Sequence, residues 1–153
     1  MKMSPEYQKA QKNMEPGVIT ASGFLGDDKR PIIEIITEDE ERMAKAGLDF
    51  AETGERLREL LMAGRKGMGE PVTIEGKWLV KTDETRGYLA SPFEDGIFRK
   101  MNTVVEPVGA EHKGLRLMYS ELSLHLLEKW HFLQGKGSPF RLEPDTMRKV
   151  LGV

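Results

Sequence analysis

Cysteine is absent from the 153 residues of this chain. Its absence excludes disulfide bonds, thiolate metal ligands and a cysteine nucleophile, and it fits a reducing compartment, so we expect a cytoplasmic protein. Histidine is also scarce, with 3 residues. His125 and His131 are six positions apart, which places them about 120° apart around a continuous helix and prevents them from binding one metal ion together. We expect neither a metal nor a cofactor.

Long apolar runs are missing too. No run approaches the roughly 20 apolar residues of a membrane-spanning helix, and residues 1–17 lack the apolar core of a signal peptide, so we expect a soluble protein without a membrane partner. A net charge of -2, with many charges of both signs, gives no general attraction to nucleic acid. The length and a hydrophobic fraction of 39% are typical of one ordinary domain.

The first residues differ in composition from the rest of the chain. Residues 1–16 are polar and end at Pro16, which predicts a flexible N-terminal arm or a short helix that stops at the proline. Residues 17–153 then form a single domain. Its first stretch, residues 17–26, has glycines at both ends and a β-branched start, and it is typical of a short strand or an extended loop on the core.

Residues 30–47 have two interpretations. As one helix, the segment begins with a cap from Asp27 or Asp28 and carries its apolar residues on one stripe. As a strand followed by a helix, residues 32–36 form the strand. We favour the single helix. Asp39 and Glu40 then lie on or beside the apolar stripe, at a bend, at the rim of the contact or as a buried acid with a partner, and we favour the rim.

The next segments predict a second helix and a small sheet. Asp49 resembles an N-cap before a helix that reaches the glycines after Arg65, which completes a helix hairpin. Residues 71–107 intersperse apolar residues with turn residues, which is typical of antiparallel strands. Glu75–Gly76 marks the turn of the first strand hairpin, and residues 91–96 mark a loop before another strand.

The densest apolar run lies near the C-terminus. Residues 114–134 carry leucine and aromatic residues around most of the circumference of a helix, so we predict one long, buried helix. Pro144 and Asp145 begin a short terminal helix. The predicted fold is therefore α+β, with a helix hairpin and a long C-terminal helix packed on a small, mostly antiparallel sheet.

Most of the side chains that could take part in chemistry belong to that long helix. Glu121, His125 and Glu128 stand four and three residues apart, so they share one polar stripe. Carboxylates beside an imidazole can orient it for general-base catalysis. The same pattern is also typical of the solvent-exposed edge of a helix without a catalytic role. We take His125 and Glu121 as the candidate catalytic residues.

The loop after the helix supplies two cations. Lys136 lies between two glycines and Arg141 follows a proline and a phenylalanine, so the backbone can approach an anion that the cations neutralise. We take Lys136 and Arg141 as candidate ligand-binding residues. The alternative is that they are helix-end charges that form surface pairs. A phosphate-binding P-loop is excluded, because the helix precedes the glycines and Gly137 stands where that motif has Ser or Thr.

Several runs of sequence carry a resemblance. The chain resembles a group of bacterial conserved hypothetical proteins without an assigned function in the runs SGFLGDDKR, EPVTIEGKW and LSLHLLEKWHF with GKGSPFRLEP. The similarity spans about residues 22 to 150. It implies one intact domain, and it implies no activity, cofactor or catalytic residue.

Three classes of function are compatible with these patterns. The favoured one is binding of a small anionic ligand, with or without catalysis, where His125, Lys136 and Arg141 converge beside the long helix. The second is a protein-interaction or assembly module, including a homo-oligomer, that uses the apolar helix faces. The third is a winged helix, because a helix hairpin precedes a strand hairpin. Acids of the second helix cancel most of its basic charge, which argues against nucleic acid.

Overall fold

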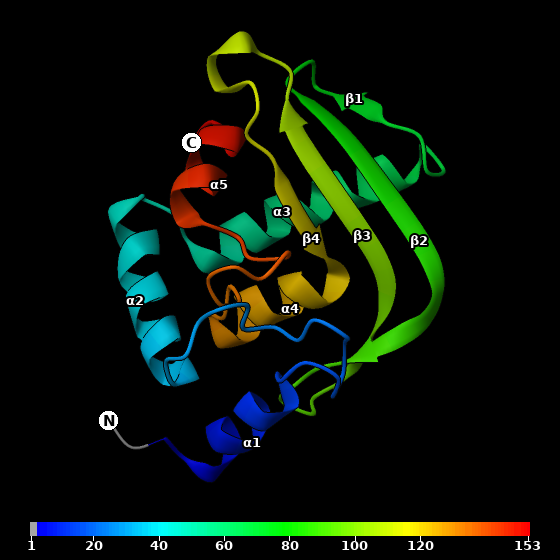
Figure 1. Ribbon diagram of the computed structural model, residues 1–153. Coiled ribbons are helices and arrows are strands. Elements are labelled where there is room, and N and C mark those ends of the chain that lie inside the picture. Colours follow the sequence, from blue (N-terminus) through cyan, green and yellow to red (C-terminus); the bar gives the residue numbers. More distant parts are fainter. Residues whose placement is uncertain (1–2) are drawn as a thin grey trace.

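The computed structural model of the protein describes residues 3–153 and has an α+β fold (Figure 1). No helix within these residues is long and apolar enough to cross a membrane. Helices and strands follow one another in the order α1 Pro5–Asn13, α2 Ile32–Lys45, α3 Phe50–Arg65, β1 Val72–Ile74, β2 Trp78–Ala90, β3 Ile97–Pro107, the 3-10 helix η1 Ala110–His112, β4 Leu117–Ser120, α4 Glu121–Trp130 and α5 Pro144–Leu151.

The sheet is antiparallel and its strands are ordered β1-β2-β3-β4. Strands β1 and β2 pair across the Glu75–Gly76 turn, which confirms the predicted hairpin. Strands β2 and β3 form a long, curved hairpin that bounds one side of the molecule (Figure 1). Its loop at residues 91–96 is also where the sequence predicts one.

The prediction of one long helix over residues 114–134 is wrong. Residues 117–120 form β4, which pairs with β3, and α4 has only 10 residues. Ser120 starts α4 with a capping box, since the Ser120 side chain accepts a hydrogen bond from the Ser123 N–H and the Ser123 side chain accepts one from the Ser120 N–H. The helix ends at His131, which has a left-handed φ of 54°. The terminal helix α5 is short as well, with 8 residues.

The single-helix interpretation of residues 30–47 is confirmed by α2. Its capping differs from the prediction, because Pro31 is the N-cap and neither acid before it caps the helix. Gln11 of α1 supplies the missing acceptor, at 3.0 Å from the Ile32 N–H. Asp49 caps α3 as predicted, and its carboxylate accepts from the Glu52 N–H at 2.8 Å. In space α2 contacts α5 and α1, whereas α3 lies on the sheet and against α4.

Two apolar clusters share α4. The first lies between α3, α5 and one face of the sheet, and the second lies between α1, α2, the loop at 24–25 and the other side of α4. Part of the predicted arm belongs to the second cluster, since Ala10 and Met14 are buried there and the Tyr7 ring packs edge-on against Trp130. Helix α4 is therefore the element on which both halves of the core meet.

Candidate functional site

His125 lies beside Asp95 rather than beside Glu121. The Asp95 Oδ2 atom is 2.8 Å from His125 Nε2, accepts from Trp130 Nε1 at 2.9 Å, and is 3.2 Å from Lys129 Nζ. The His125 ring packs against Phe98 with 4.5 Å between the ring centroids. Asp95 thus attaches the loop between β2 and β3 to α4, which gives His125 a structural partner.

Asp95 is held in its ionised form. Burial alone raises the pKa of this carboxyl, but hydrogen bonds from Ser91, Trp130, His125 and Lys129 outweigh burial and hold the pKa well below its ordinary value. The sequence pattern missed this acid because it lies 30 positions before His125.

Glu121 points to another side of α4. It lines a hollow together with Arg58, Arg65 and Arg99. Its Oε2 atom is buried and has no hydrogen-bond partner among residues 3–153. Although Glu121 and His125 are one helical turn apart, their side chains therefore have separate surroundings.

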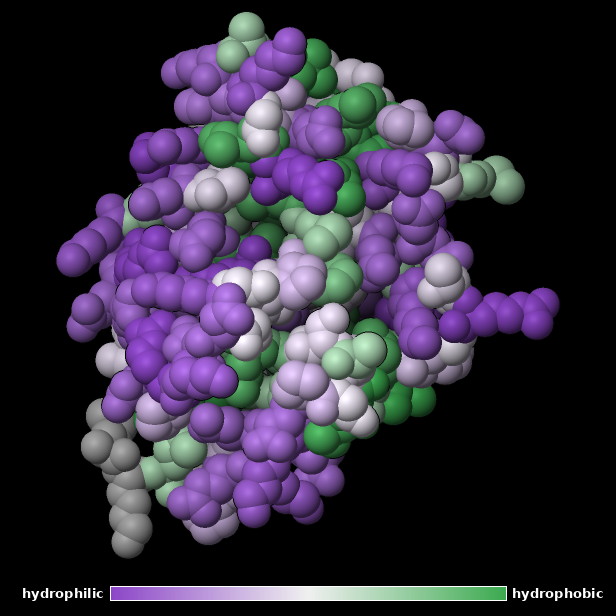
Figure 2. Space-filling view, viewed as in Figure 1, coloured by the Kyte–Doolittle hydropathy of each residue, from purple (hydrophilic) through white to green (hydrophobic). Residues whose placement is uncertain are grey.

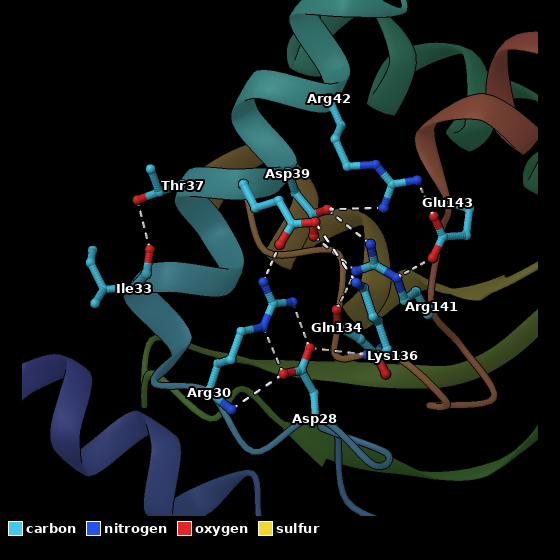
Figure 3. A network of polar contacts seen from close by, with 11 residues as sticks. Asp28, Arg30, Ile33, Thr37, Asp39, Arg42, Gln134, Lys136, Arg141 and Glu143 are labelled. Carbon is cyan, nitrogen blue, oxygen red and sulfur yellow. Dashed lines mark hydrogen bonds and ion pairs between the residues drawn. The ribbon is translucent and has the colours of Figure 1, made fainter.

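Arg141 is enclosed in a network of polar contacts (Figure 3). Its guanidinium donates from Nη1 and Nη2 to the two carboxylate oxygens of Asp39, both at 2.8 Å. The two side chains are 4% and 2% exposed. The prediction that Asp39 lies at the rim of α2 is wrong, because this acid is buried and its charge is compensated by a cation that follows α4.

Further contacts fix the Arg141 guanidinium in place. It donates from Nε to Glu143 at 2.6 Å and from Nη1 to the backbone oxygen of Gln134 at 2.6 Å. Arg42 binds the same Glu143 at 2.8 Å. Burial alone lowers the pKa of Arg141, but Asp39 and Glu143 raise it above its ordinary value. Arg141 therefore uses four of its five N–H donors inside the protein and is buried against two carboxylates, so it is not free to bind an anion.

Lys136 belongs to the outer edge of this network. Its side chain is 57% exposed, and its Nζ atom lies 3.8 Å from Glu38 Oε1. Its backbone N–H donates to Asp28, which also accepts two hydrogen bonds from the Arg30 side chain. The hydrogen bond from the Arg30 side chain has the largest effect on the Asp28 carboxyl. Together these hydrogen bonds lower the pKa of Asp28 to about 2.

The glycines around Lys136 bring two loops together. Gly135 N–H donates to Phe24 O at 3.0 Å, and Asp27 N–H donates to Lys136 O at 2.8 Å. A side chain at Gly135 or at Gly26 would lie closer than 3.0 Å to backbone atoms of the opposite loop. The glycines predicted to let the backbone approach an anion instead let it approach residues 24–27.

The paired loops enclose a cavity of about 140 Å³ beside the start of α4. Its polar lining includes Gln134, which is 4% exposed and has a left-handed φ of 72°. The Gln134 Oε1 atom accepts from the Ser138 hydroxyl at 2.6 Å, while no hydrogen bond within residues 3–153 uses its Nε2 atom. The complete lining consists of Thr20, Ala21, Ser22, Gly23, Phe24, Leu89, Asn102, Ser120, Leu122, Gln134, Pro139 and Phe140.

The four residues predicted from the sequence do not form one site. His125 binds Asp95, Glu121 lines the arginine hollow, Arg141 is enclosed by acids, and Lys136 lies at the surface. The residue that the sequence analysis missed is Gln134. No local pattern in the sequence distinguishes Gln134. It is a site residue because its backbone is left-handed and because segments distant in the sequence enclose a cavity around its side chain.

The described part of the chain contains no group of three or more His, Asp or Glu side chains that could hold a metal ion. No family model, curated protein or solved structure matches the sequence or the fold in the three comparisons with known proteins.

Proposed function

We propose that the protein binds a small, uncharged organic molecule in the cavity beside α4. The observation that carries this proposal is the Gln134 side chain, which is almost fully buried, lines the cavity and has an amide nitrogen without a protein partner among residues 3–153. The nitrogen is not sealed in the core, since the buried side-chain atoms without a partner do not include it, and it is therefore open to the cavity. A hydrogen-bond acceptor on a ligand would supply the partner of Gln134.

The backbone around Gln134 supports the proposal. A left-handed φ on a residue other than glycine costs on the order of 1–3 kcal/mol, and such residues cluster at binding sites. Here the conformation is held from two sides, because Arg141 binds the Gln134 carbonyl and Ser138 binds its side-chain oxygen. These contacts hold the amide group in one orientation before any ligand arrives, which lowers the entropy cost of binding.

The lining indicates the class of ligand. No charged side chain lines the cavity. Its apolar surface comes from residues such as Phe24, Leu122 and Phe140. Its polar groups are the amides of Asn102 and Gln134 and the hydroxyls of Thr20, Ser22 and Ser120. Drug-sized sites have about 300–1,000 Å³, so a volume of about 140 Å³ fits a smaller molecule. A neutral amide or a small heterocycle has the required acceptor and apolar face.

The surface over the cavity agrees with this class of ligand. In Figure 2 hydrophilic residues cover the side of α2, whereas residues of intermediate hydropathy gather over the loop at 17–26. The proposal retains the small-ligand function expected from the sequence and changes the charge of the ligand, because Arg141 is already bound to acids. The winged-helix alternative gains no support, since Arg56, Arg58 and Arg65 all bind carboxylates.

The test is a thermal-shift and NMR screen of small neutral amides and heterocycles, followed by titration of each hit. Gln134→Glu replaces the free amide nitrogen with an oxygen at constant shape, and we expect it to weaken binding at least about tenfold. Gln8→Glu makes the same change on the exposed face of α1 and serves as the control.

A second variant covers the case in which Gln134→Glu does not fold. Ala21 is exposed at the cavity, so Ala21→Phe should block ligand entry while the protein keeps its unfolding midpoint. A screen without hits, or hits that bind both variants as tightly as the unchanged protein, would refute the proposal.

A further inference from the structure

A second hollow lies on the opposite side of α4, between α3 and β3. It has a volume of about 210 Å³ and no residue in common with the cavity at Gln134. Three arginines surround it, Arg58 and Arg65 from α3 and Arg99 from β3. Its remaining lining consists of Leu61, Met62, Met101, Glu121 and Leu124.

Protein acids already compensate two of the three arginines. Arg58 donates to both carboxylate oxygens of Glu128, at 2.9 and 2.5 Å. Arg65 donates from Nε and Nη2 to Glu84, at 3.0 and 3.3 Å. These two ion pairs leave the rim close to neutral and hold both guanidinium groups in fixed positions.

Two groups of opposite charge remain without hydrogen bonds. Arg99 is 3.8 Å from Glu84 Oε2, and its guanidinium makes no hydrogen bond to any residue from 3 to 153. On the other side, Glu121 Oε2 is buried without a partner in that same part of the chain. A buried carboxylate oxygen without a donor costs free energy that a bound donor would recover. The hollow therefore presents a cation that has only a loose ion pair with Glu84 and N–H donors without hydrogen bonds, and a carboxylate oxygen without a donor.

We propose that this hollow binds a small zwitterion that carries a carboxylate and a protonated amine, of the kind found in free α-amino acids. The ammonium donates to Glu121 Oε2, and the carboxylate accepts from the Arg99 guanidinium and from Arg65 Nη1, which the pair with Glu84 leaves free. A simple anion would satisfy Arg99 and leave Glu121 unpaired.

The walls of the hollow indicate which amino acids fit. Leu61, Met101 and Leu124 are buried and form an apolar lining, and Met62 is 44% exposed. Methionine side chains adapt their shape to apolar ligands. An aliphatic side chain such as that of leucine or methionine can pack on these residues while its charged groups reach the arginines and Glu121.

The test uses titration calorimetry of the full chain with L-leucine, L-methionine, N-acetyl-L-leucine, L-leucinamide and inorganic phosphate. We expect the free amino acids to bind, and we expect loss of either charge, by acetylation or amidation, to weaken binding at least about tenfold. Glu121→Gln and Arg99→Gln should each have a similar effect. Arg116→Gln, at an exposed position outside the hollow, should leave binding unchanged.

Three results would overturn the inference: binding of N-acetyl-L-leucine as tightly as L-leucine, binding of phosphate alone, or no binding of any probe. Gln134→Glu separates this site from the cavity on the other side of α4, because it should leave amino-acid binding unchanged.

Discussion

Two arginine forks in this protein have the same chemistry in different surroundings. Arg141 binds both oxygens of Asp39, and Arg58 binds both oxygens of Glu128. The side chains of the first pair are 4% and 2% exposed, and those of the second are 44% and 29% exposed. Burial therefore distinguishes the two pairs, while their hydrogen-bond patterns do not.

The comparison shows that the same hydrogen-bond geometry affects the free energy of unfolding differently in a buried pair and in an exposed pair. A buried ion pair gains little net stability, because both charges lose their hydration, but removal of one partner leaves a buried charge uncompensated and costs about 3–5 kcal/mol. An exposed pair contributes about 0–1 kcal/mol, because water solvates either partner alone. The pair between α2 and the loop after α4 should thus determine whether these segments stay joined, and the pair between α3 and α4 should not.

The largest effect is expected for the buried fork. Arg141→Met should lower the free energy of unfolding by about 3–5 kcal/mol, because buried Asp39 would lose the guanidinium that binds both its oxygens and keep only Arg42, at 4.0 Å. Urea titration measures this loss. The double variant Asp39→Leu with Arg141→Met removes both charges and should regain most of the stability. A single variant that loses less than about 1 kcal/mol would show that water reaches this pair.

A smaller effect is expected where the loop after α4 touches the backbone of the loop at 24–27. Gly135→Ala should cost about 1–3 kcal/mol, because the new methyl group would overlap the backbone of Leu25. Gly109→Ala is the matched control, since nothing lies near its added carbon and its φ is -68°. Equal stability of the two variants would indicate that the contact between these two loops tolerates a side chain at position 135.

Acid should weaken the polar network at Asp28, which adjoins the buried fork. The pKa of Asp28 is lowered in the folded protein, to about 2 from its ordinary 3.8, so its ionised form stabilises the fold above about pH 4. This contribution, at most about 2 kcal/mol, is lost as the pH falls from about 4 to 2. Unfolding free energies measured across this window should fall less steeply in Asp28→Asn than in the unchanged protein.

The smallest effect is expected for the exposed fork. Arg58→Gln should change the free energy of unfolding by about 0–1 kcal/mol, and added salt should reduce the difference further. Thermal unfolding at low and high ionic strength measures both. A loss near that of Arg141→Met would mean that the hollow beside Arg58 is far drier than the exposed fractions of the pair indicate.

The elements with local signals could be predicted from the sequence. Helix α3 has its cap at Asp49, and the first strand hairpin has its turn at Glu75–Gly76. Strand β4 could not be predicted in this way, because Leu117 and Tyr119 also continue the apolar spacing of the following helix. Their strand conformation depends on pairing with β3 at Val105 and Thr103, which no local pattern contains.

The candidate sites depend even more on distant contacts. The spacing of Glu121 and His125 correctly places them one turn apart, but their partners come from other elements: Asp95 lies between β2 and β3, and the arginines lie on α3 and β3. A buried acid on α2 was among the possibilities for Asp39. Its partner could not be identified, because the two residues are separated by 102 positions.

That separation has a consequence for synthesis. At about 5–20 residues per second, roughly 5–20 s pass between the addition of Asp39 and that of Arg141 to the growing chain. During this interval Asp39 has only Arg42, three residues later on α2, as a nearby cation, and the loop at 24–27 has no backbone partner from residues 135–136. The apolar stripe of α2 can pack early on Ala10, Met14 and Phe24, but it lacks its partners on and after α4 (Leu122, Leu126 and Phe132) until the last quarter of the chain has been made.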